Sequence, residues 1–321
     1  MPAIPVAFRI APTLVALLLS MSLPIASAAP LQIVKREIKQ HKPTHEVEFS
    51  YPITGHKAID AVVEGWARKL ATEFSVDAEE ARDERPWSSE LSFEVPRNDG
   101  KVFSLVFSHY TYTGGAHPNS SYRTFHFLLP DGYQADIAEL FSPRGIRRIS
   151  DMSIAALRRD LAGPDGMSDA DWIRRGAGPN PRNFSSFVLT PDELTVLFDA
   201  YQVAAYAAGP QEVKIPVSRL RDTLRPDPRA PAASFDCGEA RGVIETAICS
   251  SRALARLDRA LAEAYIDALT WATDEAQRRT IQQSQRAWIS VRDGTCRNAG
   301  ANVVSCLTPL YEARLKALSS R

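Results

Sequence analysis

The spacing of apolar residues alternates between strand-like and helix-like stretches along the first part of the chain. Residues 45–51 alternate around Val47 and Phe49, which predicts a strand, and residues 57–74 carry apolar side chains at helical spacing. Three more strand-like runs follow at residues 91–95, 101–112 and 121–129, with Gly-containing turns between them. This succession predicts an antiparallel meander with a helix packed against it.

The pattern then returns to helical spacing at residues 146–161, and shorter strand-like runs follow at residues 186–189, 194–198 and 213–215. The segment 163–183 between them is rich in Gly, Pro and Asp and predicts a mobile loop. This mixture of strands and helices predicts an α+β domain, an antiparallel sheet with packed helices.

The last part of the chain shows helical spacing only. Three amphipathic helices are predicted, and acidic residues at 274 and 275 open the second of them. Their apolar stripes are Leu254, Leu257, Leu261, Tyr265 and Leu269; Ile281, Ser284, Trp288 and Val291; and Leu307, Leu310, Tyr311, Leu315 and Leu318. A core built from three short helices is small, so we expect covalent cross-links to contribute substantially to its stability.

A proline-rich stretch separates these two patterns. Residues 224–233 contain three prolines and almost no apolar periodicity, which predicts an extended, semi-rigid connector. We therefore divide the chain into a signal peptide at residues 1–29, an α+β domain at 30–223, a linker at 224–233 and a small all-α domain at 234–321.

The N-terminus has the three parts of a secretory signal peptide. Arg9 precedes an apolar core at residues 14–25, and Ala26, Ser27 and Ala28 form a small-x-small cleavage motif. We expect cleavage and a periplasmic or secreted mature protein without a membrane anchor. The chain holds 38 basic and 38 acidic residues. This balance argues against the basic footprint of a nucleic-acid-binding protein.

All four cysteines, Cys237, Cys249, Cys296 and Cys306, lie in the predicted all-α domain. Their intervals of 12, 47 and 10 residues do not fit a structural zinc site, which pairs cysteines about two to four residues apart, and no Cys-x-x-Cys redox motif is present. Because an exported protein meets an oxidising environment, we predict two disulfides. Three pairings are possible. We favour the local pairs Cys237–Cys249 and Cys296–Cys306, although an antiparallel hairpin would also bring Cys249 close to Cys296.

A string of residues in the all-α domain carries a family resemblance. In its first half the matching residues are Phe235, Asp236, Cys237, Glu245, Thr246, Ala247, Ile248, Cys249, Leu257, Asp258, Arg259, Ala260, Leu261 and Tyr265. In its second half they are Gln285, Arg286, Ala287, Trp288, Val291, Arg292, Asp293, Cys296, Cys306, Leu307, Tyr311 and Arg314. In this order they resemble the LprI lysozyme-inhibitor family (DUF1311-like). The resemblance implies lysozyme as a partner.

Residues 32–222 carry a second resemblance. Its matching residues are Tyr51, Pro52, Ile53, Tyr112, Thr113, Gly114, Gly115, Ala116, His117, Asp131, Gly132, Asp136, Ile137, Leu140, Phe141, Tyr201, Gln202, Val203, Tyr206, Ala207, Ala208, Gly209, Ile215 and Pro216. They resemble the extracytoplasmic domain shared by the RsiV anti-sigma factor and PdaC-type peptidoglycan deacetylases (DUF3298-like). In RsiV this domain senses lysozyme, and in the deacetylases it accompanies a catalytic domain. The Thr-Phe-Asp-Asp run of that catalytic domain is absent from this sequence.

Both resemblances imply a binding protein directed at lysozyme or another wall-degrading enzyme. We expect an inhibitor that occludes the enzyme's cleft sterically. The alternative is a peptidoglycan- or glycan-binding protein of envelope maintenance without inhibitor activity. No catalytic residue, metal ligand or cofactor is expected, so we predict that the protein is not an enzyme.

The candidate contact surface is the loop between the strands at 101–112 and 121–129. It consists of Tyr112, Thr113, Gly114, Gly115, Ala116, His117, Pro118 and Asn119. The glycines supply the positive φ of a turn, and His117 is expected to hydrogen-bond across it. Alternatively, His117 could join His109 and His126 in a three-histidine zinc site. Tyr110, Tyr112 and Tyr122 flank the turn and could form an aromatic rim for a glycan or a protein.

Weaker candidates lie elsewhere. Trp288 and Arg292 could form an exposed hot spot for a protein partner, or Trp288 could fill the helical core while Arg292 pairs with Asp293. Asp131 and Asp136 could form a carboxylate pair for glycosidic chemistry, but Asp131 fits an ordinary Pro-Asp-Gly turn.

Charge favours the first domain as the contact surface. Lysozymes are usually basic, so an inhibitor is expected to offer carboxylates. Residues 234–321 hold 12 basic and 10 acidic side chains, whereas the most acidic run is residues 77–84 in the first domain.

Overall fold

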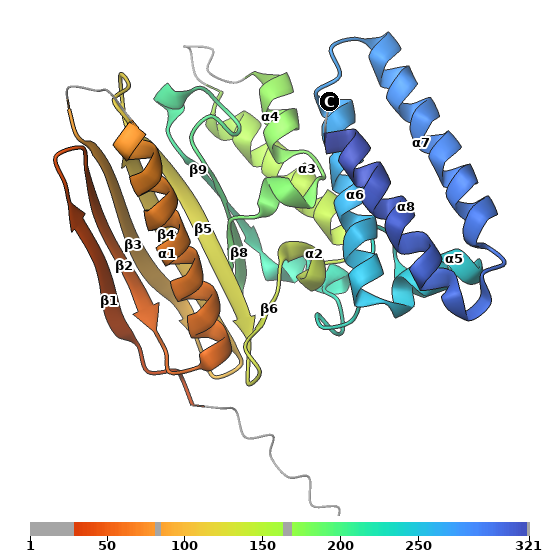
Figure 1. Cartoon of the computed structure of the whole chain (residues 1–321), viewed down its shortest axis with the longest axis horizontal. Coiled ribbons are helices and arrows are strands. Elements are labelled where there is room, and N and C mark those ends of the chain that lie inside the picture. The colour runs from red at the N-terminus through yellow and green to blue at the C-terminus, as the bar shows by residue number, and fades with distance from the viewer. Residues whose placement is uncertain (1–28, 81–84, 163–168, 320–321) are drawn as a thin grey trace, which may run out of the picture.

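The computed structural model describes residues 29–80, 85–162 and 169–319, and Figure 1 shows their arrangement. The predicted signal peptide lies outside the described residues except for Ala29, as do residues 163–168 of the predicted loop and 81–84 of the acidic run. Within the described ranges, none of the helices has the length and apolarity that crossing a membrane requires.

A six-stranded sheet forms the first half of the N-terminal region. Its strands lie in sequence order, and all neighbouring pairs are antiparallel except β2 and β3. The strands are β1 (Val34–His41), β2 (His45–Ile53), β3 (Trp87–Asn98), β4 (Val102–Tyr112), β5 (Asn119–Leu128) and β6 (Tyr133–Gln134). The predicted meander of β3, β4 and β5 is thus confirmed. The parallel pair differs from the prediction, because helix α1 (Lys57–Glu80) makes the crossover that parallel neighbours require.

Helix α1 covers one face of this sheet, as Figure 1 shows. It buries Ile59, Val63, Ala67 and Ala71, which recur along one side of the helix. The sheet contributes buried side chains at alternate strand positions: Val47, Phe49, Leu91, Phe103, Leu105, Phe107, Phe125 and Phe127. Fully burying one such side chain contributes about 1.5–3 kcal/mol, so this cluster is a major source of stability.

A three-stranded antiparallel sheet forms the second half of the N-terminal region, with a core of its own. Its strands are β7 (Phe187–Leu189), β8 (Glu193–Phe198) and β9 (Gln211–Pro216). Around it lie α2 (Ile137–Leu140), α3 (Pro143–Asp160), α4 (Ala170–Ala177) and the 3-10 turns η1 (Pro181–Phe184), η2 (Tyr206–Ala208), η3 (Val217–Arg219) and η4 (Arg221–Thr223). Helix α4 and η1 replace much of the predicted mobile loop, so that prediction is wrong there. Asp169 caps α4 through two backbone amides, and Ile173 and Ala177 are buried.

Polar contacts join the two sheets through the face of β5 opposite α1. His126 Nε2 lies 2.7 Å from the carbonyl oxygen of Phe187, and the Phe187 amide donates to Thr124 Oγ1 at 3.1 Å. The three-stranded sheet therefore covers this face near β5. The same face stays open on β2 and β3, where Glu48 and Glu90 are exposed.

Four helices form the C-terminal region, one more than predicted. They are α5 (Gly242–Ser250), α6 (Arg252–Thr270), α7 (Glu275–Cys296) and α8 (Val303–Ser319), with 3-10 turns η5 (Cys237–Glu239) and η6 (Gly300–Asn302). Helix α5 is nine residues long, too short to show a stripe in the sequence, and it buries Ile244, Ala247 and Ile248. The all-α prediction for this region is confirmed.

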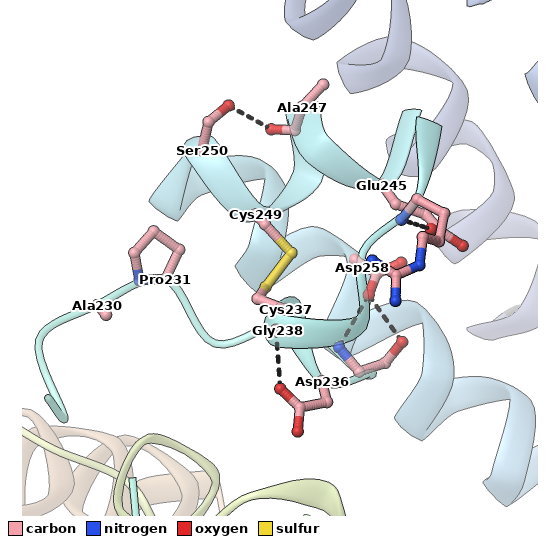
Figure 2. The surroundings of a disulfide bond; sticks show 12 residues. Ala230, Pro231, Asp236, Cys237, Gly238, Glu245, Ala247, Cys249, Ser250 and Asp258 are labelled. Atoms are coloured by element: carbon pink, nitrogen blue, oxygen red, sulfur yellow. Dashed lines mark hydrogen bonds between the residues drawn. A yellow bond between two sulfur atoms is a disulfide. The ribbon is translucent and has the colours of Figure 1, made fainter. Parts of the chain in front are cut away.

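Two disulfides cross-link the C-terminal region, Cys237–Cys249 and Cys296–Cys306, and the favoured pairing is confirmed. Figure 2 shows the first of them between the turn at Cys237 and the end of α5, near Asp258. The second joins the end of α7 to the start of α8. Each bridge therefore closes a turn beside a helix end.

The proline-rich connector is held against the N-terminal region. The Arg225 amide donates to the Leu140 carbonyl at 2.9 Å, and Arg229 pairs with Asp131 at 2.6 Å. The Ala230 amide donates to the carbonyl of residue 227, so the stretch turns instead of staying extended. The division of the chain at residues 30–223, 224–233 and 234–321 stays a prediction.

Candidate functional site

The loop at residues 112–119 joins β4 to β5 and is held by two tyrosines from the connection between β8 and β9. The His117 ring stacks on the Tyr206 ring, with the ring centroids 3.8 Å apart. The Tyr206 hydroxyl donates to the Pro118 carbonyl at 2.8 Å, and the Tyr201 hydroxyl lies 3.2 Å from His117 Nε2. These contacts hold the loop in one conformation.

The turn inside this loop fits its sequence. Gly114 has a φ of 78°, in the left-handed region that glycine adopts without strain. His117 Nδ1 lies 3.0 Å from the Pro118 carbonyl oxygen, which can only accept a hydrogen bond. Nδ1 therefore carries the proton, and Nε2 accepts from the Tyr201 hydroxyl. In this arrangement both ring nitrogens of His117 have partners, and the ring orients the loop.

The outer edge of the loop is accessible to a partner. Thr113, Gly115, Ala116 and Asn119 are exposed, whereas Tyr112, Gly114, His117 and Pro118 are half-buried. The loop is thus held in place by its contacts, and its exposed side chains are small.

The three-histidine zinc site is not formed. His109 and His126 lie on opposite faces of the sheet, because His126 pairs with Ser104, which is an odd number of residues from His109 along β4. His109 instead lies 2.8 Å from Ser89 Oγ. Burial lowers the pKa of both histidines to about 4. Among the described residues, no group of three His, Cys, Asp or Glu side chains is placed to hold a metal ion.

The two aspartates considered as a carboxylate pair each have a structural partner. Asp131 pairs with Arg229 at 2.6 Å, and this contact lowers the pKa of the Asp131 carboxyl. Asp136 caps α2 in a capping box and pairs with Arg259 at 2.6 Å. Both carboxylates therefore hold the fold and its connector in place.

The strands assemble an acidic surface that does not form a run in the sequence. Glu46 and Glu48 on β2 and Glu90 and Glu94 on β3 are all exposed on the sheet face opposite α1, and we call these four residues the acidic face. Glu48 and Glu90 are direct cross-strand neighbours, a position in which like charges destabilise a sheet. Within the described residues, Glu46, Glu90 and Glu94 have no ion pair, and Glu48 has only a 3.9 Å contact with His41.

A groove of about 330 Å³ adjoins the acidic face. Its lining includes Glu48, Glu90, Ser92, Ser108, Tyr110 and Tyr122. Tyr110 is 39% exposed. Two of the three tyrosines predicted to form a rim therefore line one surface, and Tyr112 does not belong to it.

Trp288 and Arg292 lie mainly inside the helical region. The Arg292 guanidinium lies 5.3 Å from a ring centroid of Trp288 and donates to the Tyr311 hydroxyl at 2.8 Å. The Tyr311 hydroxyl donates to Asp258 at 2.8 Å, and burial raises the pKa of Tyr311. Arg292 also pairs with Asp293, and its side chain is only 13% exposed. This cluster therefore serves the scaffold.

Three family models match the chain in consecutive segments. Residues 16–120 match Deacetylase PdaC, residues 138–218 match Protein of unknown function (DUF3298), and residues 237–318 match Lysozyme inhibitor LprI. These matches confirm both resemblances inferred from the sequence.

Individual proteins are similar to the N-terminal part of the chain. It is 25% identical over 185 residues to the peptidoglycan-N-acetylmuramic acid deacetylase PdaC of Bacillus subtilis (strain 168), a match that spans 57% of this chain and 39% of that protein. A DUF3298 family protein from Pseudomonas aeruginosa PAO1 aligns with a TM-score of 0.50 at 20% identity, over 63% of this chain and 98% of that one. This alignment supports the fold. A DUF3298 member from Bacteroides fragilis NCTC 9343 aligns at 16% identity with a TM-score of 0.43, over 62% and 96% of the two chains.

The sequence patterns missed the residues that hold the loop. Tyr201 lies 84 residues from His117 in the sequence. Both Tyr201 and Tyr206 carry the N-terminal resemblance, which is the one signal that could have linked them to the loop. The acidic face had a signal of its own, because Glu46 and Glu48 occupy alternate positions of a strand-like run.

Proposed function

We propose that the protein is an exported, non-enzymatic inhibitor that binds lysozyme or a related wall-degrading enzyme and occludes its cleft. The match of residues 237–318 to the lysozyme-inhibitor model is the observation that carries this function. The PdaC match and the two disulfides support a periplasmic or secreted protein.

The N-terminal region supplies the contact surface in this proposal. A fixed loop with small exposed side chains loses little conformational freedom when it enters a cleft. The acidic face attracts a basic enzyme and orients it. The two features lie close together, because Tyr110 is the cross-strand neighbour of Glu90 and lies two residues before the loop along β4.

The test mixes purified mature protein with c-, g- and i-type lysozymes. It measures co-elution of the two proteins and the rate at which each enzyme lyses cells. We expect inhibition of at least one type. Ala116→Arg places a long charged side chain at the exposed edge of the loop and should weaken inhibition about ten-fold or more. Ala276→Arg, on the exposed first turn of α7, is the matched control. Absence of both binding and inhibition with every type contradicts the proposal.

The alternative is a peptidoglycan- or glycan-binding function without inhibition. The similarity of the N-terminal region to a peptidoglycan deacetylase supports it. A pull-down with purified sacculi in the absence of lysozyme separates the two functions. Retention on sacculi by a protein that inhibits none of the enzymes favours the alternative.

A further inference from the structure

A groove between the N-terminal region and the helical region is lined by three aromatic rings. It lies between α4, the connection of β8 to β9, and the end of α6, and its volume is about 470 Å³. Figure 1 shows where α4 and α6 lie in the fold. The rings are those of Trp172, Tyr201 and Trp271. Trp271 is 70% exposed and Tyr201 is 47% exposed. Exposed rings gathered in a hollow between two domains are typical of a ligand site, because a ligand there removes their apolar area from water.

Backbone contacts fix the N-terminal wall of this groove. The Trp172 indole nitrogen donates to the Tyr201 carbonyl at 2.8 Å. Tyr201 has a φ of 69°, a backbone strain of the kind that gathers at binding sites. A Cβ atom at Gly176 would lie 1.9 Å from the Gln202 carbonyl oxygen, so only glycine permits this approach of α4 to the connection.

Polar contacts fix the two walls to each other. Arg182 pairs with Glu263 at 3.0 Å and with Asp267 at 2.9 Å. Asn180 Nδ2 donates to Asp267 at 2.7 Å. Because Asp267 lines the groove, these bonds lie at its border, and a ligand meets rings that are already positioned.

Arg175 supplies the cationic side chain that lines the groove. Its guanidinium lies 5.7 Å from a ring centroid of Trp271. No ion pair involves Arg175 within the described ranges, and its Nε is buried without a hydrogen-bond partner there. The Asp267 carboxylate in the same groove is already engaged by Asn180 and Arg182. A ligand carboxylate would therefore complement the Arg175 guanidinium.

We propose that this groove binds a glycan chain that carries carboxylate groups. The aromatic faces suit the C–H faces of sugar rings, and Arg175 suits a carboxylate. The remaining lining, which includes Asn183, Gln202 and Thr270, contains no aliphatic side chain, unlike the apolar centre of a protein interface. Glycan binding in this groove does not require that the protein inhibit lysozyme.

Calorimetric titration of the full mature chain with three soluble probes tests the ligand class. The acidic probes are muropeptides released from peptidoglycan and an oligogalacturonate, and the neutral probe is chitotetraose. We expect saturable binding of at least one acidic probe, about ten-fold tighter than that of chitotetraose. The acidic probe that binds tighter identifies the source of the carboxylates. No saturable binding of either acidic probe, or equal or tighter binding of chitotetraose, overturns the proposal.

Two variants separate the ring from the charge. Trp271→Ala should weaken all bound probes about ten-fold, and Arg175→Gln should reduce the acidic probes to the affinity of chitotetraose. Val291→Ala and Arg286→Gln, both exposed on α7, are matched controls and should bind as the wild type does. Wild-type binding by both groove variants overturns the proposal. Trp271 directly follows α6, whereas the loop at residues 112–119 joins β4 to β5. Trp271→Ala should therefore inhibit lysozyme as the wild type does, and this result distinguishes a failure of the groove from a failure of the proposed function.

Discussion

The N-terminal and C-terminal regions reach a stable fold by different routes. The N-terminal region contains no cysteine and buries two large apolar clusters. The C-terminal region buries a smaller cluster and adds two disulfides and the polar chain of Arg292, Tyr311 and Asp258. The difference follows from size, because a short chain buries a smaller fraction of its apolar surface and needs other constraints on its unfolded state.

The two regions also differ in where the residues that carry their family resemblances lie. In the C-terminal region, residues that carry the family resemblance, such as Asp258 and Tyr311, are buried and pack in its interior. In the N-terminal region the corresponding residues include His117, which is half-buried in the loop, and Tyr201, which is exposed. In the C-terminal region, the residues shared with the LprI family therefore stabilise the fold. The contacts with a partner are proposed for the N-terminal region, which has no cysteine.

Removing a core ring gives the largest expected effect and acts on the N-terminal region. Phe107 is fully buried, and its ring lies 4.9 Å from that of Trp66. Phe107→Ala leaves a cavity and should cost about 3–5 kcal/mol of unfolding free energy, measured by urea denaturation. Val34→Ala, at an exposed position of β1, is the control and should change little. A loss below about 1 kcal/mol for Phe107→Ala would contradict the view that this core stabilises the region.

Removing a disulfide acts on the C-terminal region alone. The double variant Cys296→Ser and Cys306→Ser frees a 10-residue loop and should cost about 3 kcal/mol, because the unfolded chain gains entropy. Scanning calorimetry should report the loss as a lower transition temperature of the helical region, which then unfolds first. Treating the wild type with a reducing agent opens both bridges, so it should lower the helical transition further than the double variant does and leave the N-terminal transition in place. A reduced protein with an unchanged transition would mean that the bridges do not stabilise this region.

Sequence patterns predicted the elements whose formation depends on near neighbours. The hairpins of β3, β4 and β5 have Gly-containing turns, and α1 and α6 have apolar stripes longer than a few turns. Helix α5 is too short for such a stripe, and β1 is an exposed edge strand with mainly polar side chains, so neither shows a pattern.

The rest depends on contacts between distant parts of the chain. The parallel pairing of β2 with β3 follows from how α1 packs on the sheet, which local spacing does not encode. The loop at residues 112–119 was predicted from its glycines, but its support by Tyr201 comes from 84 residues further on. Arg175 and Trp271 meet across two regions, so no local motif predicts their groove.

Lowering the pH from 7 to 5 should reduce the stability of the N-terminal region and not that of the C-terminal region, because all six histidines precede residue 127. Burial lowers the folded-state pKa of His126 to about 4 from an ordinary value of 6.5. Between these two pH values the unfolded chain binds a proton that the folded chain does not, so stability is full above pH 6.5 and falls as the pH drops towards 4. At pH 5 the loss from His126 should be about 2 kcal/mol. In His126→Gln, urea denaturation at pH 7 and 5 should show a smaller pH-dependent loss than in the wild type, and an equal loss would contradict this role.

Removing the ion pairs of Arg182 between the regions gives the smallest expected effect and tests whether the two regions are stabilised independently. Arg182 joins η1 to α6 through Glu263 and Asp267, but its side chain is 51% exposed, so Arg182→Ala should cost less than about 1 kcal/mol. Because each wall loses a partner, the small loss should appear in the unfolding transitions of both regions. Arg159→Ala removes an exposed pair with Asp160 inside the N-terminal region and is the control for a change confined to that region. An unchanged C-terminal transition in Arg182→Ala would mean that other contacts between the regions, such as Arg259 with Asp136, carry the coupling instead.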